Sequence, residues 1–81
     1  MNYTHLVYVR KYSIVSNKYE LYVYGVNTSD IFHTMGEMMY RSETEVKRID
    51  FVELNQDNMN SKLDFWKNEN KEIHTWIDKY H

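Results

Sequence analysis

A run of alternating side chains between Leu6 and Val26 most constrains what this chain can fold into. Tyrosines alternate with aliphatic residues along 4–15 and again along 19–26, and a polar triplet at 16–18 separates the two segments. Alternation with a period of two is typical of β-strands, and the asparagine in the triplet favours a turn because it tolerates a positive φ. The stretch therefore predicts a β-hairpin.

The alternation also assigns the side chains of the hairpin to two faces. With the turn at 16–18, the aliphatic residues of both strands share one face and the tyrosines share the other. Tyrosine and arginine are enriched at interface hot spots, so the tyrosine face is the first candidate partner-binding surface. It comprises Tyr8, Arg10, Tyr12, Tyr22 and Tyr24. Two alternatives remain for this face: a second core layer under a C-terminal helix, or a platform for stacked nucleic-acid bases.

A helix is predicted over 29–40, because capping residues precede a run with helical spacing. The N-cap candidates are Asn27, Thr28 and Ser29, and Asp30 suits the positive end of the helix dipole. Its apolar stripe consists of Ile31, Phe32, Met35, Met38 and Met39. We expect this stripe to be core on the aliphatic face of the sheet, with an adaptable partner-binding surface as the alternative. Gly36 is expected to permit close approach of a neighbouring backbone.

Two further elements are predicted in the second half of the chain. Residues 45–54 indicate a third strand whose imperfect alternation favours a bulge or an edge position. A long helix is predicted from residue 57 or 58 to the C-terminus, with a heptad seam of Met59, Leu63, Trp66, Asn70, Ile73, Ile77 and Tyr80. The seam favours an amphipathic helix packed on its own sheet. The alternative is a homodimer through Trp66, Asn70, Ile73 and Ile77.

These elements predict a single α+β domain over residues 1–81. The expected order is β-β-α-β-α, with a three-stranded, mainly antiparallel sheet and a long C-terminal helix. A chain of 81 residues buries a small core, so we expect a partner subunit or another protein to supply further burial.

Composition narrows the range of functions. The net charge is −2, from ten basic against twelve acidic residues, which argues against a generic binder of nucleic-acid backbones. No cysteine is present, so disulfides and cysteine zinc sites are excluded. No apolar run is long enough to span a membrane and no signal peptide is evident, so a cytoplasmic location is expected.

No catalytic, cofactor or metal motif is evident. His74, Asp78 and His81 share one face of the predicted C-terminal helix, but three ligands over two turns of a helix do not converge on one ion. There is no spaced Ser/His/Asp set, and two glycines in the whole chain do not make a phosphate-binding loop. We therefore expect a protein that is not an enzyme and carries no cofactor.

One resemblance extends over residues 4–54. The order strand, strand, helix, strand, with Gly25, Ser29 and Asp30 at the entry to the helix, resembles the small phage-encoded inhibitors of uracil-DNA glycosylase. The resemblance implies a dimer that occludes the nucleic-acid site of a host enzyme through the 29–40 helix. The positions that it singles out are Phe32, Met35, Met39 and Tyr40.

The expected function is therefore a non-enzymatic, protein-binding inhibitor. The absence of proline and the abundance of Asn, Lys, Tyr and Met are typical of AT-rich genomes, which favours a phage or mobile-element origin. The partner would be a host nucleic-acid enzyme or defence nuclease in the host cytoplasm. The alternatives are a single-stranded nucleic-acid-binding module and a small homo-oligomeric structural protein.

Overall fold

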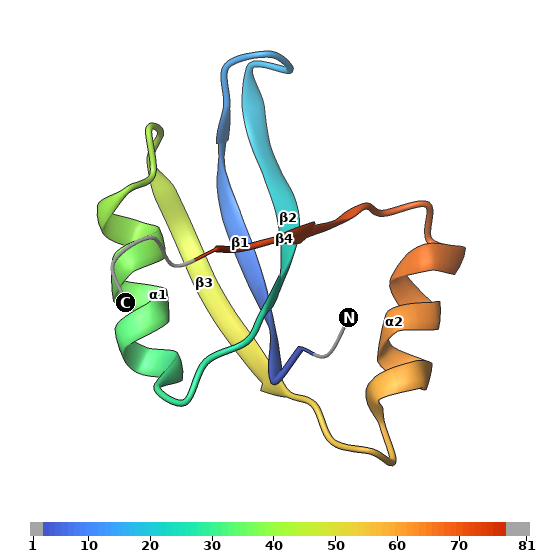
Figure 1. Ribbon diagram of the computed structural model, residues 1–81. Helices are drawn as coiled ribbons and strands as arrows, with labels where there is room; N and C mark the ends of the chain where they lie inside the picture. The colour runs from blue at the N-terminus through green and yellow to red at the C-terminus, as the bar shows by residue number, and fades with distance from the viewer. Residues whose placement is uncertain (1–2, 78–81) are drawn as a thin grey trace.

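The computed structural model describes residues 3–77 as one small α+β domain (Figure 1). Its elements, in chain order, are β1 (His5–Ser13), β2 (Lys18–Val26), α1 (Ile31–Tyr40), β3 (Val46–Glu53), α2 (Met59–Asn68) and β4 (Ile73–Thr75). They build a four-stranded sheet in the order β3-β1-β2-β4. Strand β1 is antiparallel to both β2 and β3, whereas β4 runs parallel to β2. The α+β class and the order of the first five elements are confirmed; the three-stranded sheet and the long C-terminal helix are wrong.

The hairpin turn lies earlier than the sequence predicts. Ser13 pairs with Lys18, so the turn comprises residues 14–17. Asn17 has a φ of 60°, which confirms its expected left-handed conformation, and its backbone N–H donates to the Ser13 carbonyl at 2.8 Å. The register therefore differs by an odd number of residues from the one that a turn at 16–18 would produce.

This register divides the predicted tyrosine face. Tyr8 lies opposite Val23, and Tyr24 lies opposite Val7. Residues directly opposite each other in a ladder point to the same face of the sheet. Tyr8 and Tyr12 therefore share one face and Tyr22 and Tyr24 share the other. The predicted joint tyrosine surface is wrong, because a one-residue change of register exchanges the faces of a whole strand.

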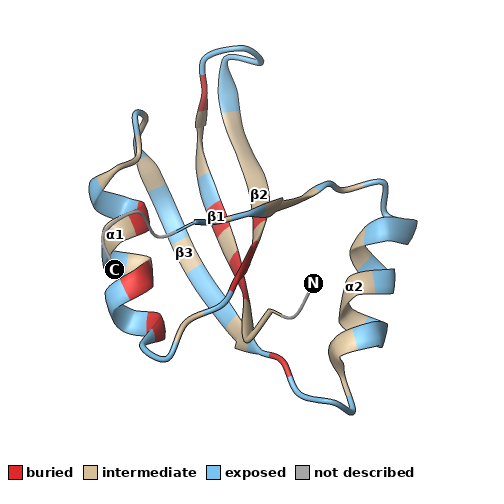
Figure 2. Cartoon of the chain, in the orientation of Figure 1, coloured by how far each residue is buried: buried red, intermediate tan, exposed pale blue. Residues whose placement is uncertain are grey.

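Both faces of the sheet are covered by apolar clusters. On the α1 face the buried residues are Val7, Val9, Val26, Ile31 and Met38. On the opposite face they are Leu6, Val23 and Leu54, against which the half-buried α2 residues Met59, Leu63 and Trp66 pack. Figure 2 shows buried residues on β1, β2 and α1 but none on α2. The alternative that the Tyr8 face forms a second core layer under α2 is thus confirmed for Tyr8, whose ring centroid is 5.4 Å from that of Trp66.

Helix α1 begins one residue after Asp30, which is its N-cap. The Asp30 carboxylate accepts a hydrogen bond from the His33 N–H at 3.1 Å, a role that the sequence assigned to a residue of 27–29. Ile31, Thr34 and Met38 are buried, whereas two members of the predicted stripe, Phe32 and Met39, are exposed. A stripe that includes positions i+1 and i+8 is too wide for one sheet contact. A Cβ on Gly36 would meet nothing within 4 Å, so the expected close approach there is wrong.

Helix α2 ends at Asn68, and a left-handed residue follows two positions later, in the middle of the predicted heptad seam. Asn70 has a φ of 56°. The Asn70 N–H donates to the Lys67 carbonyl at 3.1 Å and the Lys71 N–H donates to the Trp66 carbonyl at 2.9 Å. These are the two hydrogen bonds of a Schellman C-cap, with Asn70 at the left-handed position.

The residues of the predicted dimer seam consequently lie in four different parts of the structure. Trp66 lies on α2, Asn70 in the cap, Ile73 in β4, and Ile77 is exposed after β4. Tyr80, the last member of the seam, lies outside the described residues, as do Asp78 and His81 of the rejected metal set. A continuous seam for a paired helix is therefore wrong.

Replacing Asn70 with leucine is expected to lower the free energy of unfolding by about 1–2 kcal/mol, because a left-handed conformation strains most residues that carry a Cβ. Glycine at the same position is the matched control, since it adopts this conformation freely, and should change stability by less than about 0.5 kcal/mol. Urea denaturation followed by circular dichroism measures both. A leucine variant as stable as the wild type would contradict the capping role.

Strand β3 occupies one edge of the sheet, as its imperfect alternation predicts. Its register against β1 shifts between Arg10 and Lys11, which is the predicted bulge. The helices of the described range 3–77 are all shorter or more polar than a bilayer crossing requires.

Candidate functional site

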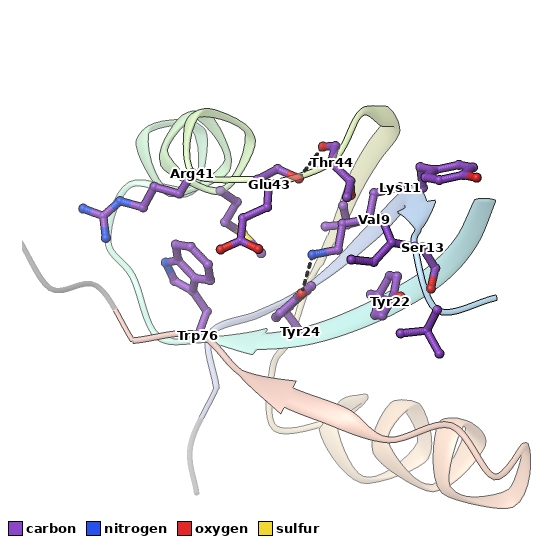
Figure 3. Close-up of a pocket in the computed structure, with 14 residues that line it drawn as sticks. Val9, Lys11, Ser13, Tyr22, Tyr24, Arg41, Glu43, Thr44 and Trp76 are labelled. Carbon is purple, nitrogen blue, oxygen red and sulfur yellow. Dashed lines mark hydrogen bonds between the residues drawn. The ribbon is translucent and has the colours of Figure 1, made fainter. Parts of the chain in front are cut away.

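A groove on the α1 face of the sheet gathers the most chemically varied side chains of the domain (Figure 3). Its volume is about 360 Å³. The strands β1 and β2 supply one wall, and the segment that follows α1 supplies the other. Its charged and aromatic lining residues are Lys11, Tyr22, Tyr24, Arg41, Glu43 and Trp76.

Lys11 lies at the centre of the aromatic wall. Its Nζ donates a hydrogen bond to the Tyr24 hydroxyl at 3.2 Å and lies 4.9 Å from the Tyr22 ring centroid and 5.7 Å from that of Tyr24. An ammonium group over aromatic faces is stabilised by the ring quadrupole. The His74 ring lies 5.4 Å from Tyr24 and so extends the aromatic surface into β4. A lysine held in this way keeps a fixed position while it still has N–H groups to offer to an acceptor.

The opposite wall carries charges of both signs. Arg41 pairs with Glu37 one helical turn earlier, with Nε and Oε2 separated by 3.2 Å. In Figure 3, Glu43 reaches toward the groove from the same segment. The Trp76 ring meets the Tyr24 ring edge-on at 6.2 Å, and its backbone N–H is held by the Gly25 carbonyl. The wall is therefore built from α1, its following loop and the residue after β4.

The hairpin turn adds an apolar tip to the groove. Ile14 and Val15 border the groove and are 77% and 94% exposed. Figure 1 shows this turn projecting past the ends of β3 and α1. Turn positions normally favour Gly, Asn, Asp, Ser or Pro, so two adjacent branched aliphatic side chains at such a tip are unusual. We call Ile14, Val15 and the groove beneath them the tip-and-groove site.

The structure brings together only part of the predicted partner-binding set. Tyr22 and Tyr24 lie in the groove. Tyr12 borders it near the turn, where its hydroxyl donates to the Asn17 side chain and its ring packs edge-on against Tyr19.

The other predicted residues lie elsewhere. Tyr8 packs under α2, and Arg10 is exposed on the same face, opposite Arg48. Met35 packs against the core beneath α1. The remaining three, Phe32, Met39 and Tyr40, are exposed on α1.

Several residues of the site were not singled out from the sequence, among them Ile14, Val15 and Trp76. The first two were assigned to a strand, and Trp76 to a helix. Asn17 offers a signal that would have found the tip, because the left-handed residue of a hairpin loop commonly stands at its end. Placing Asn17 last in a four-residue loop moves Ile14 and Val15 out of the strand. No comparable local signal was available for Trp76, whose position depends on β4.

One tyrosine outside the groove has a displaced pKa. The pKa of Tyr19 is raised from its ordinary value of 10.0, first by the hydrogen bond that its hydroxyl donates to the Glu45 carboxylate at 2.7 Å. A phenol with a raised pKa stays protonated at neutral pH, so this contact ties β2 to the entry of β3 and does not indicate acid–base chemistry. Within 3–77, no three His, Cys, Asp or Glu side chains are grouped so as to hold a metal ion.

Comparison with known proteins finds no match for the chain among family models, curated proteins or solved structures.

Proposed function

We propose that this chain is a non-enzymatic protein-binding domain that holds its partner at the tip-and-groove site. The observation that carries the proposal is the exposure of Ile14 and Val15 beside an aromatic groove. Neither side chain stabilises the isolated domain by burial, and an exposed apolar group next to a concave surface is typical of an interaction site. A partner that covers the tip would recover the burial that the domain itself does not provide.

The groove indicates the chemistry of the partner. The Tyr22, Tyr24 and Trp76 rings offer contact area for an apolar side chain at a low cost in conformational entropy. The Lys11 ammonium favours a carboxylate or a carbonyl oxygen next to that side chain. The expected partner segment thus carries an aliphatic or aromatic anchor with an acidic residue beside it.

The biological setting of the proposal is inhibition of a host enzyme by a phage or mobile-element protein. Support comes from the small size of the domain, its composition, and a projecting hairpin of a shape that enters a cleft in a larger protein. A host nucleic-acid enzyme or defence nuclease is the proposed target. Occlusion of its active site by the tip would require no chemistry from the inhibitor.

Replacement of Ile14 and Val15 by serine is expected to weaken binding to the partner on the order of 10- to 100-fold, as loss of central apolar contacts does in other interfaces. The partner is first isolated by affinity purification with the tagged wild-type domain and identified. Affinities are then measured with purified components by biolayer interferometry. Because both side chains are exposed, the double variant should keep the wild-type unfolding midpoint.

Ile77→Ser is the matched control. Ile77 is 70% exposed but does not line the groove, so this substitution removes one exposed aliphatic side chain, of the same type as Ile14, at another place. The control variant should bind as the wild type does. Equal affinity of the tip variant and the control for the purified partner would overturn the proposed site.

A further inference from the structure

The edge strand β3 is the second surface of the domain that lacks a covering element. In the sheet order β3-β1-β2-β4, no described residue of 3–77 pairs with the outer side of β3. β3 has eight residues, whereas the opposite edge strand, β4, has three. Long open edges are templates for pairing with another strand, and natural proteins usually guard them with charges or keep them short.

The backbone of β3 determines which of its residues are available to a new strand. The Leu54 N–H donates to the Thr4 carbonyl of the neighbouring segment at 2.8 Å. Hydrogen-bonding groups alternate in direction along a strand, so the N–H and C=O groups of Glu53, Phe51 and Ile49 point away from β1. An antiparallel copy of β3 forms a regular ladder only in registers that match these outward residues to one another.

Three such registers place the two-fold axis near the middle of the strand, at Ile49, Asp50 or Phe51, and charge distinguishes them. Centred on Ile49, the register sets each Arg48 opposite Asp50 of the other copy, so opposite charges meet twice. Centred on Asp50, it sets Lys47 opposite Glu53 twice, but it also sets the two Asp50 carboxylates directly against each other. Centred on Phe51, it sets Ile49 opposite Glu53. Cross-strand pairs of opposite charge stabilise a ladder and like pairs destabilise it, so the first register is favoured.

The charges on this edge are therefore self-complementary. Within one chain, Arg48 Nε and the Asp50 carboxylate form an ion pair at 2.7 Å, with both side chains largely exposed at 76% and 53%. The residues lie two apart on one face of the strand. In the register centred on Ile49 the same two groups join a four-membered network of alternating sign. An edge strand that carried charges of one sign only would repel a second copy of itself.

Apolar side chains lie beside the same edge on the α1 face. The exposed Phe32 of α1 meets Phe51 of β3 edge-on at 5.7 Å, and Met39 follows Phe32 seven residues later on the same side of the helix. Figure 1 shows α1 alongside β3. The two-fold axes of an antiparallel ladder are perpendicular to the sheet, so two copies joined at β3 carry their α1 helices on the same face. Their exposed rows would then face each other across the axis.

We infer that two copies of this chain pair through β3 into one continuous sheet, centred on Ile49, with Arg48 of each copy opposite Asp50 of the other. The α1 residues Phe32 and Met39 close the interface over the sheet. No residue of this surface lines the tip-and-groove site, so the pairing does not depend on the proposed function. A dimer formed in this way displays two hairpin tips.

Two charge reversals test the inference. Sedimentation equilibrium of the full-length chain should give a dimer of the 10.0-kDa protein with a dissociation constant below about 100 µM. Arg48→Asp sets like charges opposite each other twice, and so does Asp50→Arg. Each single variant should dimerise at least about 10-fold more weakly than the wild type. Asp64→Arg on the exposed surface of α2 is the matched control and should dimerise normally.

An equimolar mixture of Arg48→Asp and Asp50→Arg chains provides the decisive measurement. In a mixed pair, one chain carries aspartate at positions 48 and 50 and the other carries arginine at both. Each aspartate then lies opposite an arginine, so the two variants should associate as a heterodimer. Native mass spectrometry separates it from either homodimer by mass. A monomeric wild type at 100 µM or above, single variants that dimerise like the wild type, or a mixture that does not form the heterodimer would each overturn the inference.

Discussion

Leu6→Ala is expected to lower the free energy of unfolding by about 2–5 kcal/mol. Leu6 is completely buried in the cluster between the sheet and α2, together with Val23 and Leu54. Removal of its isobutyl group leaves a cavity, because the surrounding side chains relax only partially. No residue of α2 is itself fully buried, so the helix closes this cavity only in part. Urea denaturation followed by far-ultraviolet circular dichroism measures the loss.

Val15→Ala is the control, because Val15 is almost fully exposed and should change stability by less than about 0.5 kcal/mol. A domain of this size has little stability to lose, and a cost at the upper end of this range exceeds its whole free energy of unfolding at 25 °C. Leu6→Val, with an expected loss of about 1 kcal/mol, then keeps the comparison measurable. If Leu6→Ala were as mild as Val15→Ala, the α2 face would not be a core.

Gly25→Ala is expected to cost about 1–3 kcal/mol through overpacking. A Cβ at Gly25 would overlap the Tyr3 ring, which lies directly over this residue. The ring is held there by packing on the second cluster and by a 2.7 Å hydrogen bond between its hydroxyl and Thr75 Oγ1. To admit the methyl group, Tyr3 must move and weaken its connection to β4.

A double-mutant cycle isolates this contact. In a Tyr3→Ala background, Gly25→Ala should cost less than about 0.5 kcal/mol, which gives a coupling energy of at least about 1 kcal/mol. Gly36→Ala is the opposite control: its Cβ enters open space on an exposed helix, so it should raise stability by about 0.5–1 kcal/mol. Equal costs of Gly25→Ala with and without Tyr3 would show that the ring is not the cause.

Local signals in the sequence were sufficient for the element types in the first two thirds of the chain. Alternation of side chains predicted the hairpin and the strand over 45–54, and capping residues with helical spacing predicted α1. The left-handed Asn17 and the irregular edge strand were also predicted, because each depends on interactions within a few residues. The limits of α1 were predicted within two residues.

Faces and pairings were predicted less well, because they depend on register. The turn occupies 14–17, and the resulting register sends Tyr22 and Tyr24 to the α1 face while Tyr8 goes under α2. One residue of register exchanges every side chain between the faces, whereas the pattern of alternation stays the same. The sequence pattern therefore does not distinguish the two arrangements.

The last third of the chain shows the limit of periodicity. Heptad spacing from Met59 onward predicted a long helix, yet Asn70 ends α2 and Ile73 begins a strand parallel to β2. A three-residue strand has no periodic signal of its own; it forms because β2 offers an open edge. Trp76 enters the groove only as a consequence of this pairing.

The sequence by itself determined the α+β class, the hairpin, α1 and the edge strand, because the spacing of apolar residues and the turn and cap residues act over short distances along the chain. Tertiary structure alone decided the hairpin register, the end of α2, the strand β4 and the assembly of Lys11, Tyr22, Tyr24 and Trp76 around one groove. These features depend on contacts between residues far apart in the chain, for which local propensity offers nearly equal alternatives and burial against the sheet selects one.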